Sequence, residues 1–349
     1  MANTEKILDK NFIVPVSIDK DGFTFYDATG FDLYGIKSTD GGFSRINPDE
    51  ARKISENVFE ISYETAGGRV CFATDSPKIA IIAEYNRVAK LPNYSFSTTM
   101  GFDIYSGGRF VGVFVPPFHA TESYESVVKV PFDDGKIHEY TVNFPICSDV
   151  KRLLIGVARG SKIAKGGRYT QELPIVFYGS STTQGACASR PGNAYENIVS
   201  RALDSDFINL GFAGNALGEE AMARYIAGLD MSAFVYDYDY NAPSAEHLAA
   251  THERMFKIIR EAKPSLPIII MSAPKPYPND GDKKREQIIY TTYKNAVQNG
   301  DKNVYFLSGS EILLPVRDNA LTDNIHPGDV GFVAIANAII SMLKALPHR

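Results

Sequence analysis

Two consecutive serines, Ser180 and Ser181, follow the apolar run "IVFYG". A serine hydroxyl at the end of a buried strand is a candidate nucleophile when the chain also supplies a base. The segment "TDNIHPG" contains Asp323 and His326, three residues apart in a turn that leads into an apolar helical stretch. A histidine can accept the serine proton while an aspartate holds the imidazole in one tautomer. These residue types predict acyl transfer through a serine nucleophile.

Two further segments offer hydrogen-bond donors for an oxyanion. The segment "GFAGNALG" contains Gly214, and the segment "DYDYNAP" contains Asn241. A backbone N–H group and an amide side chain both stabilise a developing oxyanion, and one such donor contributes about 3–4 kcal/mol. Taken alone, Gly214 is better explained as a turn glycine and Asn241 as an Asx turn that ends a strand. The prediction therefore depends on the order of the four segments along the chain.

An alternation of apolar strands and amphipathic helices after residue 170 predicts how these side chains meet. Five successive strand–helix units indicate a parallel sheet with helices on both faces. Ligands on such sheets bind at the carboxyl ends of the strands, where the serine, glycine and asparagine all fall. We predict an α/β fold in which residues 169–349 form a three-layer α/β/α domain with a five-stranded parallel sheet. The predicted strands are 175–179, 206–213, 233–241, 267–274 and 304–309, and the predicted helices are 194–203, 219–229, 245–262, 285–300 and 329–346.

The first half of the chain has a different pattern, in which short apolar runs alternate with glycine, proline and aspartate turns. No long stretch of helical period occurs between about residue 60 and residue 160. Many short strands of this kind predict a β-sandwich or jelly roll, and we assign it to residues 1–168. The predicted strands lie within 67–85, 101–117, 136–146 and 150–158.

The four segments together resemble the SGNH hydrolases, also called GDSL-type esterases and lipases. The resemblance implies a flavodoxin-like catalytic domain in which Ser181, His326 and Asp323 form the triad. It also implies an oxyanion hole made by the N–H groups of Ser181 and Gly214 and the side chain of Asn241. Two departures from the family pattern are present: Ser180 replaces the usual aspartate before the nucleophile, and "DYNA" replaces the usual Gly-x-Asn-Asp.

The longer stretch "GSSTTQGACASRPG" resembles one branch of this superfamily, in which an N-terminal β domain carries a Gly-x-Asp-Leu-Tyr signature. Two segments fit that signature, "GFDLY" at 30–34 and "GFDIY" at 101–105. The second lies in a predicted hairpin and is preferred for that reason. The resemblance implies an esterase that releases acetyl or similar small acyl groups, commonly from carbohydrate. It implies that this esterase needs neither a metal nor a cofactor.

Two other functions compete with this one. A lipase or thioesterase for longer acyl chains would need an apolar groove beside Ser181, whereas "TTQGACASRPGN" is small and polar. A non-catalytic carbohydrate-binding protein would have no need of a nucleophile and its base. Two residues have an expected supporting role: Arg190 either orients the substrate or pins its own loop, and Asp239 either contacts the substrate or anchors the loop that carries Asn241.

Composition excludes several other classes of function. The net charge is −5 without a block of like charge, which argues against nucleic-acid binding. No apolar run approaches the roughly 20 residues that span a bilayer. The start of the chain lacks a basic region followed by an apolar stretch, so we expect no signal peptide and a cytoplasmic location. The oligomeric state stays open.

The remaining cysteines and histidines predict no metal site. Three widely spaced cysteines indicate free thiols in a reducing compartment. Cys187 is expected to be a small packing residue, because no spare base accompanies it. His247 and His252 are five residues apart on different faces of a predicted helix, and we expect both to be solvated.

Overall fold

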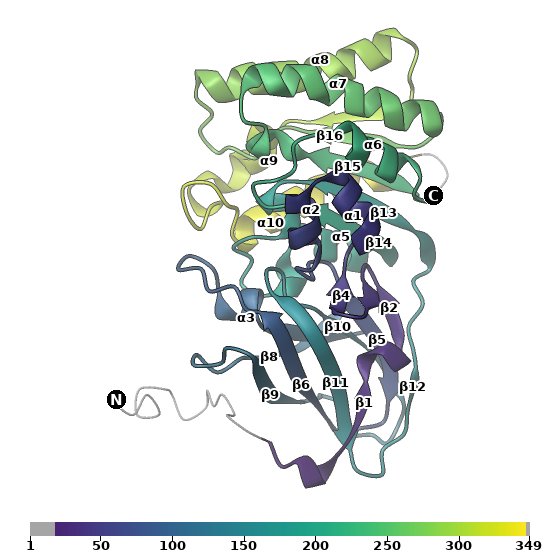
Figure 1. Ribbon diagram of the computed structural model, residues 1–349. Coiled ribbons are helices and arrows are strands. Elements are labelled where there is room, and N and C mark those ends of the chain that lie inside the picture. The colour runs from purple at the N-terminus through teal and green to yellow at the C-terminus, as the bar shows by residue number, and fades with distance from the viewer. Residues whose placement is uncertain (1–17, 347–349) are drawn as a thin grey trace.

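A computed structural model of the protein describes residues 18–346. The predicted absence of a signal peptide concerns residues outside this range. Figure 1 shows the two halves of the chain, with the antiparallel strands of the first half below and the parallel sheet of the second half with its helices above. Within the described residues, no helix is both long and apolar enough to span a bilayer.

The first half forms two antiparallel sheets around one core, which confirms the predicted β domain. Strands such as β9 (Ser123–Lys129) alternate between buried and less buried residues, as expected for strands with one face on a core. One sheet has the order β1 (Phe23–Asp27), β11 (Asp149–Ala158), β6 (Lys78–Arg87) and β9 (Ser123–Lys129). The other has the order β12 (Ile163–Lys165), β5 (Arg69–Thr74), β10 (His138–Asn143), β7 (Phe102–Ser106) and β8 (Arg109–Phe114), with β2 (Asp32–Tyr34) also paired to β5.

The second half contains the predicted five-stranded parallel sheet. Its strand order is 2-1-3-4-5, which is the flavodoxin-like order and places a switch point beside the first strand. Along the sheet the strands are β14 (Ser205–Gly211), β13 (Gln171–Gly179), β15 (Ala233–Asp237), β16 (Ile268–Met271) and β17 (Val304–Leu307). The predicted fold class and the five predicted strands are therefore confirmed.

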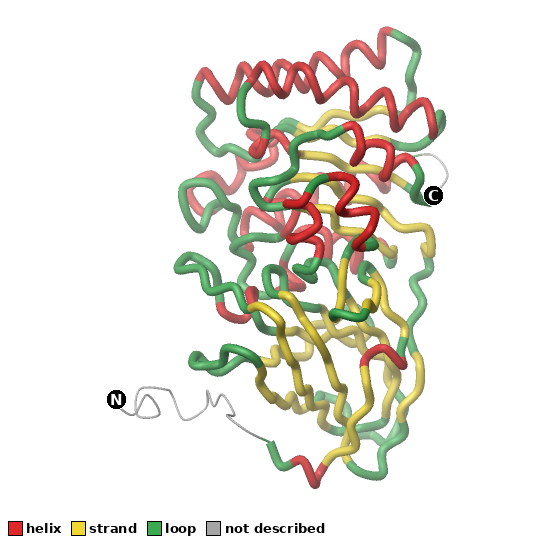
Figure 2. The backbone as a smooth tube through the Cα atoms, viewed as in Figure 1, coloured by secondary structure: helices red, strands yellow, loops and turns green. Residues whose placement is uncertain are grey.

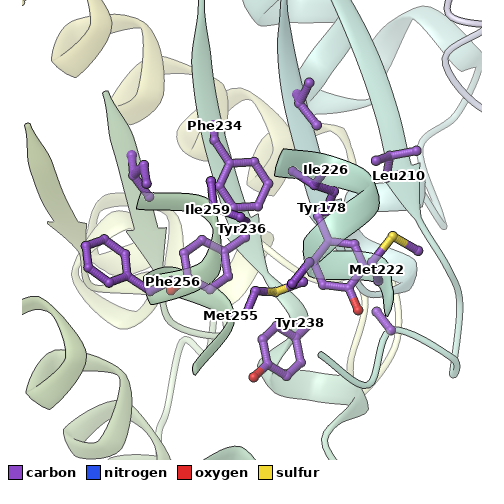
Figure 3. Packing of buried hydrophobic residues seen from close by; sticks show 14 of the residues in the cluster. Tyr178, Leu210, Met222, Ile226, Phe234, Tyr236, Tyr238, Met255, Phe256 and Ile259 are labelled. Atoms are coloured by element: carbon purple, nitrogen blue, oxygen red, sulfur yellow. The ribbon is translucent and has the colours of Figure 1, made fainter. Parts of the chain in front are cut away.

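Helices cover both faces of this sheet because alternate strand residues point to opposite sides. Val176 and Tyr178 share a core with α6 (Glu220–Ala227), α7 (Ala245–Ala262) and α8 (Asp280–Gln298). Ile175 and Phe177 share a core with α5 (Tyr195–Leu203), α9 (Gly309–Leu313) and α10 (Asp329–Ala345). Figure 3 shows the first of these cores, with methionine, phenylalanine and isoleucine side chains of α6 and α7 facing aromatic residues of the strands. The helices are α4 (Ser181–Gln184), α5 (Tyr195–Leu203), α6 (Glu220–Ala227), α7 (Ala245–Ala262), α8 (Asp280–Gln298), α9 (Gly309–Leu313) and α10 (Asp329–Ala345).

Three short helices of the first half were not predicted. After the hairpin β3 (Lys37–Thr39) and β4 (Gly42–Ser44), the chain forms α1 (Pro48–Ile54) and α2 (Glu56–Ser62). Pro48 begins α1 and Ser55 caps α2, which are ordinary start signals. Both helices pack against the α6–α7 core of the parallel sheet (Figures 1 and 2). A short helix, α3 (Phe96–Thr99), follows β6.

The expectation that His252 is solvated is wrong. Its side chain is buried beneath α8, where it stacks on Tyr236 with ring centroids 4.7 Å apart and its Nδ1 lies 2.8 Å from Thr292 Oγ1. Burial lowers the pKa of His252 to about 3, so the ring is neutral. The spacing of His247 and His252 carries no information on this contact, because α8, which covers His252, is a separate segment of the chain.

Candidate active site

The first parallel strand delivers Ser181 to the carboxyl edge of the sheet. Strand β13 ends at Gly179, Ser180 caps the short helix α4, and Ser181 is the first residue of that helix. A Cβ atom at position 179 would collide with the carboxylate of Asp237, so only glycine fits there. The Ser180 hydroxyl accepts a hydrogen bond from Thr182 N, and Ser181 is 8% exposed. The capping role explains how serine serves in the place of the family's aspartate.

Ser181, His326 and Asp323 form a continuous hydrogen-bonded line. Ser181 Oγ lies 2.9 Å from His326 Nε2, and His326 Nδ1 lies 2.8 Å from Asp323 Oδ2. A carboxylate can only accept a hydrogen bond, so Nδ1 carries the proton. Nε2 is then left as an acceptor for the Ser181 hydroxyl. This is the geometry that a serine nucleophile and its base require.

Asp323 is held as an anion by its own turn. Its Oδ1 accepts hydrogen bonds from the backbone N–H groups of Ile325 and His326, each at 2.7 Å. Partial burial raises the pKa of Asp323, but these bonds, together with those from the His326 ring and Asn93, lower it well below its usual range. The Asp-x-x-His spacing therefore works locally, because one carboxylate caps the turn and also orients the ring.

Gly214 and Asn241 lie after the next two strands of the sheet, as predicted. Gly214 is exposed and has φ +73°, a backbone conformation that favours glycine. Asn241 ends the 3-10 helix η5 (Tyr238–Asn241), and its Oδ1 accepts a hydrogen bond from Ala216 N at 3.3 Å. This contact fixes the amide so that its N–H₂ group points away from Ala216.

Asp239 anchors the segment that carries Asn241. Asp239 Oδ1 lies 2.7 Å from Arg285 Nε of α8, and its Oδ2 accepts a hydrogen bond from Ala273 N. Arg285 also donates to the backbone carbonyls of Asp239 and Ala242. These contacts match the anchoring role considered for Asp239. They occupy both of its carboxylate oxygens with protein partners.

Arg190 contacts the β domain. Its Nη1 donates to Asp103 Oδ2 at 3.1 Å and to the hydroxyl of Tyr105, and its guanidinium lies 4.1 Å from the centre of the Phe110 ring. Asp103 also accepts a hydrogen bond from Gly192 N. These contacts pin the loop after α4 to strands β7 and β8. The substrate-orienting role of Arg190 stays a prediction.

Sequence reasoning missed Asn93 and Tyr94, which the β domain brings to the triad. Asn93 Nδ2 donates to Asp323 Oδ2 at 2.6 Å, and the Tyr94 ring stands edge-on to His326. Asn93 and Asp323 are 230 positions apart. The segment "KLPNYS" reads as an ordinary loop, so no local signal marks either residue.

A buried polar group lies directly behind the nucleophile. Thr183 donates a hydrogen bond to Asp237 Oδ1, and Tyr195 donates one to Thr183 Oγ1 at 3.2 Å. Burial raises the pKa of Asp237 to about 8, and the nearby charge of Asp239 adds to the rise. Its Oδ2 has no partner among residues 18–346. The raised pKa favours the protonated form of Asp237 at neutral pH.

Cys187 adjoins the triad without the character of a nucleophile or metal ligand. Its Sγ lies 3.8 Å from Asp323 Oδ2, and the ligand atoms of Cys187, Asp323 and His326 all lie within 4.8 Å of one another. Burial and the neighbouring Asp323 raise the pKa of this thiol to about 12. Metal ions bind thiolates, and the facing atoms of His326 and Asp323 are already bonded to each other. Cys187, Asp323 and His326 are therefore better described as two triad residues with a packed thiol beside them than as a metal centre.

The fold and the chemistry available at this sheet edge are those of the carboxylic ester hydrolases. Residues 172–344 match the GDSL-like lipase/acylhydrolase family, and residues 23–163 match the GxDLY domain found at the N-terminus of SGNH hydrolase-type esterases. The chain therefore belongs to the SGNH, or GDSL-like, hydrolase family. Both "GFDLY" and "GFDIY" lie inside the matched N-terminal range, so the preference for the second stays a prediction. No curated protein matches the chain.

Three solved structures share the two-part architecture. A protein described as a GDSL-like lipase from Bacteroides ovatus is 29% identical, with a TM-score of 0.83 and coverage of 92% of this chain and 98% of that one. A salicylyl-acyltransferase from a tetracycline biosynthetic pathway is 20% identical, with a TM-score of 0.75 and coverage of 94% and 99%. An acetyl xylan esterase from Butyrivibrio proteoclasticus is 12% identical, with a TM-score of 0.60 and coverage of 92% and 98%. The similarity extends over both halves of the chain.

Proposed function

We propose that the protein is a serine esterase that removes short acyl groups, acetyl in particular, from carbohydrate hydroxyls. The observation that carries this proposal is the hydrogen-bonded line from Ser181 through His326 to Asp323. Membership of the GDSL-like family supports ester hydrolysis. The acetyl xylan substrate named for one structural neighbour supports the acetyl–carbohydrate class.

In the proposed reaction, His326 Nε2 takes the proton as Ser181 Oγ attacks the ester carbonyl carbon. The resulting imidazolium is stabilised by anionic Asp323. Collapse of the tetrahedral intermediate breaks the bond to the leaving alcohol, which takes the proton from His326. Water then gives a proton to His326 as it attacks the acyl-enzyme carbonyl carbon. Collapse of this second tetrahedral intermediate breaks the bond to Ser181 Oγ, which takes the proton back from His326 as the carboxylic acid leaves.

The oxyanion of each intermediate would be held by the backbone N–H groups of Ser181 and Gly214 and by Asn241 Nδ2. Ser181 opens helix α4, so its N–H has no partner within the helix. The Asn241 amide is oriented through its oxygen by Ala216 N. Anchoring of Asn241 before substrate arrives is the kind of preorganisation that makes such donors effective.

The test compares hydrolysis of p-nitrophenyl acetate and p-nitrophenyl octanoate by the wild-type protein and by Ser181→Ala. We expect acetate turnover to exceed octanoate turnover and to fall by about 10⁴-fold or more in the variant, because nucleophile removal leaves only residual catalysis. A fluorophosphonate should label the wild type and Ser180→Ala but not Ser181→Ala.

Unchanged hydrolysis by Ser181→Ala would reject this serine as the nucleophile. Preference for octanoate would instead favour the lipase or thioesterase alternative. Release of acetate from acetylated xylo-oligosaccharides, measured on the same two proteins, then tests the carbohydrate part of the proposal.

A further inference from the structure

The β domain reaches the acidic member of the proposed triad through one side chain. Asn93 lies between β6 and α3, and its Nδ2 is 2.6 Å from Asp323 Oδ2. The same oxygen is 2.8 Å from His326 Nδ1. Because a carboxylate accepts only, the Asn93 amide must present its N–H₂ group to Asp323. Two nitrogen donors, one from each half of the chain, thus bind one carboxylate oxygen, to which the Cys187 thiol also donates at 3.8 Å.

The next residue of the same segment touches the histidine. The Tyr94 ring centroid is 5.8 Å from that of His326, with the planes at 77°, which is an edge-to-face contact. Tyr94 also packs against the α5–α10 core of the parallel sheet. Consecutive residues of the β domain therefore contact both the carboxylate and the imidazole.

This segment is held at both ends. At the end of the segment that follows β6, Ala89 N donates to Ser148 Oγ at 3.2 Å. On the side of α3, the Thr98 hydroxyl donates to the Ala188 carbonyl in the loop that follows the nucleophile. Asn93 is itself exposed, but the segment that carries it is anchored. Its position therefore depends on contacts between the two halves of the chain.

We propose that Asn93 is a positioning residue for the triad, and that the β domain thereby completes the active site. This inference rests on the proposed function of Ser181, His326 and Asp323. Asn93 does not reach the reacting atoms. Asn93 holds the Asp323 carboxylate in the orientation that keeps His326 Nε2 directed at Ser181 while His326 gains and then loses a proton.

Replacement of the donor tests the inference on the intact protein. We expect Asn93→Ala to lower kcat for p-nitrophenyl acetate about tenfold with KM unchanged, because a charge-assisted hydrogen bond is lost from the catalytic step and not from substrate binding. Leu91→Ala, in the same loop and 44% exposed, is the matched control and should keep wild-type values.

A pH profile separates positioning from general loosening of the loop. Asn93→Asp replaces the donor by a second carboxylate, which favours the imidazolium and should move the acid limb of kcat/KM up by about one pH unit. The other titratable groups near Asp323 are Cys187, Tyr94 and Tyr240, whose pKa values are raised by burial and by Asp323. All three are neutral over that limb and cannot produce the shift.

The rate of Ser181 labelling by a fluorophosphonate distinguishes failure of this inference from failure of the proposed serine esterase function. If the wild type is not labelled, the nucleophile assignment fails. If the wild type is labelled, and Asn93→Ala and Asn93→Asp match it in labelling rate, kcat and pH profile, the role of Asn93 alone is overturned. Slower labelling of both variants, with Leu91→Ala unaffected, supports it.

Discussion

At the scale of single residues, the candidate site depends on polar side chains whose ionisation is set by a few neighbours. Asp323 stays anionic because two backbone N–H groups of its own turn bond to it. Asp237, close behind the nucleophile, is instead buried with one oxygen unpartnered among the described residues, and its pKa is raised to about 8. Two carboxyl groups near one serine thus hold opposite protonation states.

The raised pKa of Asp237 predicts that stability falls as pH rises through neutrality. Between the ordinary value of 3.8 and about 8, the unfolded chain has lost this proton while the native protein keeps it. The native state then binds more protons, and the free energy of unfolding decreases by up to about 1.4 kcal/mol per pH unit. Above about pH 8 this dependence ends.

Asp237→Asn removes that titration. We expect its free energy of unfolding, measured by urea denaturation from pH 5 to pH 8, to decline less than that of the wild type. Asp133→Asn, at an exposed position, should follow the wild-type curve. Parallel curves for the wild type and Asp237→Asn would show that Asp237 ionises freely in the native protein.

At the scale of elements, the site is built where strands pass into short helices. Strand β15 continues into η5, and η5 is fixed to α8 through Arg285. The guanidinium bonds one side chain and two carbonyl groups, which a lysine could not do with the same geometry. The position of Asn241 is therefore set by Arg285, a residue 44 positions further along the chain.

Arg285→Ala should weaken both the fold and the catalytic step. Its removal leaves buried Asp239 without its ion-pair partner, which typically costs about 3–5 kcal/mol. We expect a lower midpoint in urea and, in the folded fraction, a kcat reduced about tenfold with little change in KM, because Asn241 loses its support. Lys284→Ala, whose neighbouring ion pair is exposed, serves as control. A stable variant with wild-type kcat would contradict the anchoring role.

At the scale of the whole molecule, the two halves share their cores. Ile46 and Val58 from the first half lie in the α6–α7 core, and Ala66 and Ile146 lie in the α5–α10 core. Arg69 of β5, 1% exposed, is paired with Asp206 of β14. Removal of either half would expose apolar surface and a buried charge of the other.

We therefore expect the full chain to unfold in one cooperative transition. In differential scanning calorimetry, the van't Hoff and calorimetric enthalpies should agree. Arg69→Met should lower the melting temperature of that single transition without splitting it. Two resolved transitions in the wild type would show that the halves unfold independently, and would weaken the case for a site that both complete.

The sequence by itself was sufficient where the physical signal is local or periodic. The alternation of strand and helix periods predicted the parallel sheet, because each strand and helix must bury an apolar face. The pairing of Asp323 with His326 was also predictable, because three residues of one turn bring carboxylate and imidazole together. A serine nucleophile after the first buried strand was also predictable, whereas the choice of Ser181 over Ser180 came from the resemblance to the SGNH hydrolases.

Only the tertiary structure decided which distant residues complete the site. Asn93 and Tyr94 sit in an unremarkable loop, α1 and α2 are short, and His252 lies on a helix face that another helix covers. Each of these features is created by contacts between segments far apart in the chain, and such contacts leave no spacing or period in the sequence. Burial then determined the charges, since the same carboxyl group is anionic in Asp323 and protonated in Asp237 according to its donors and its access to water.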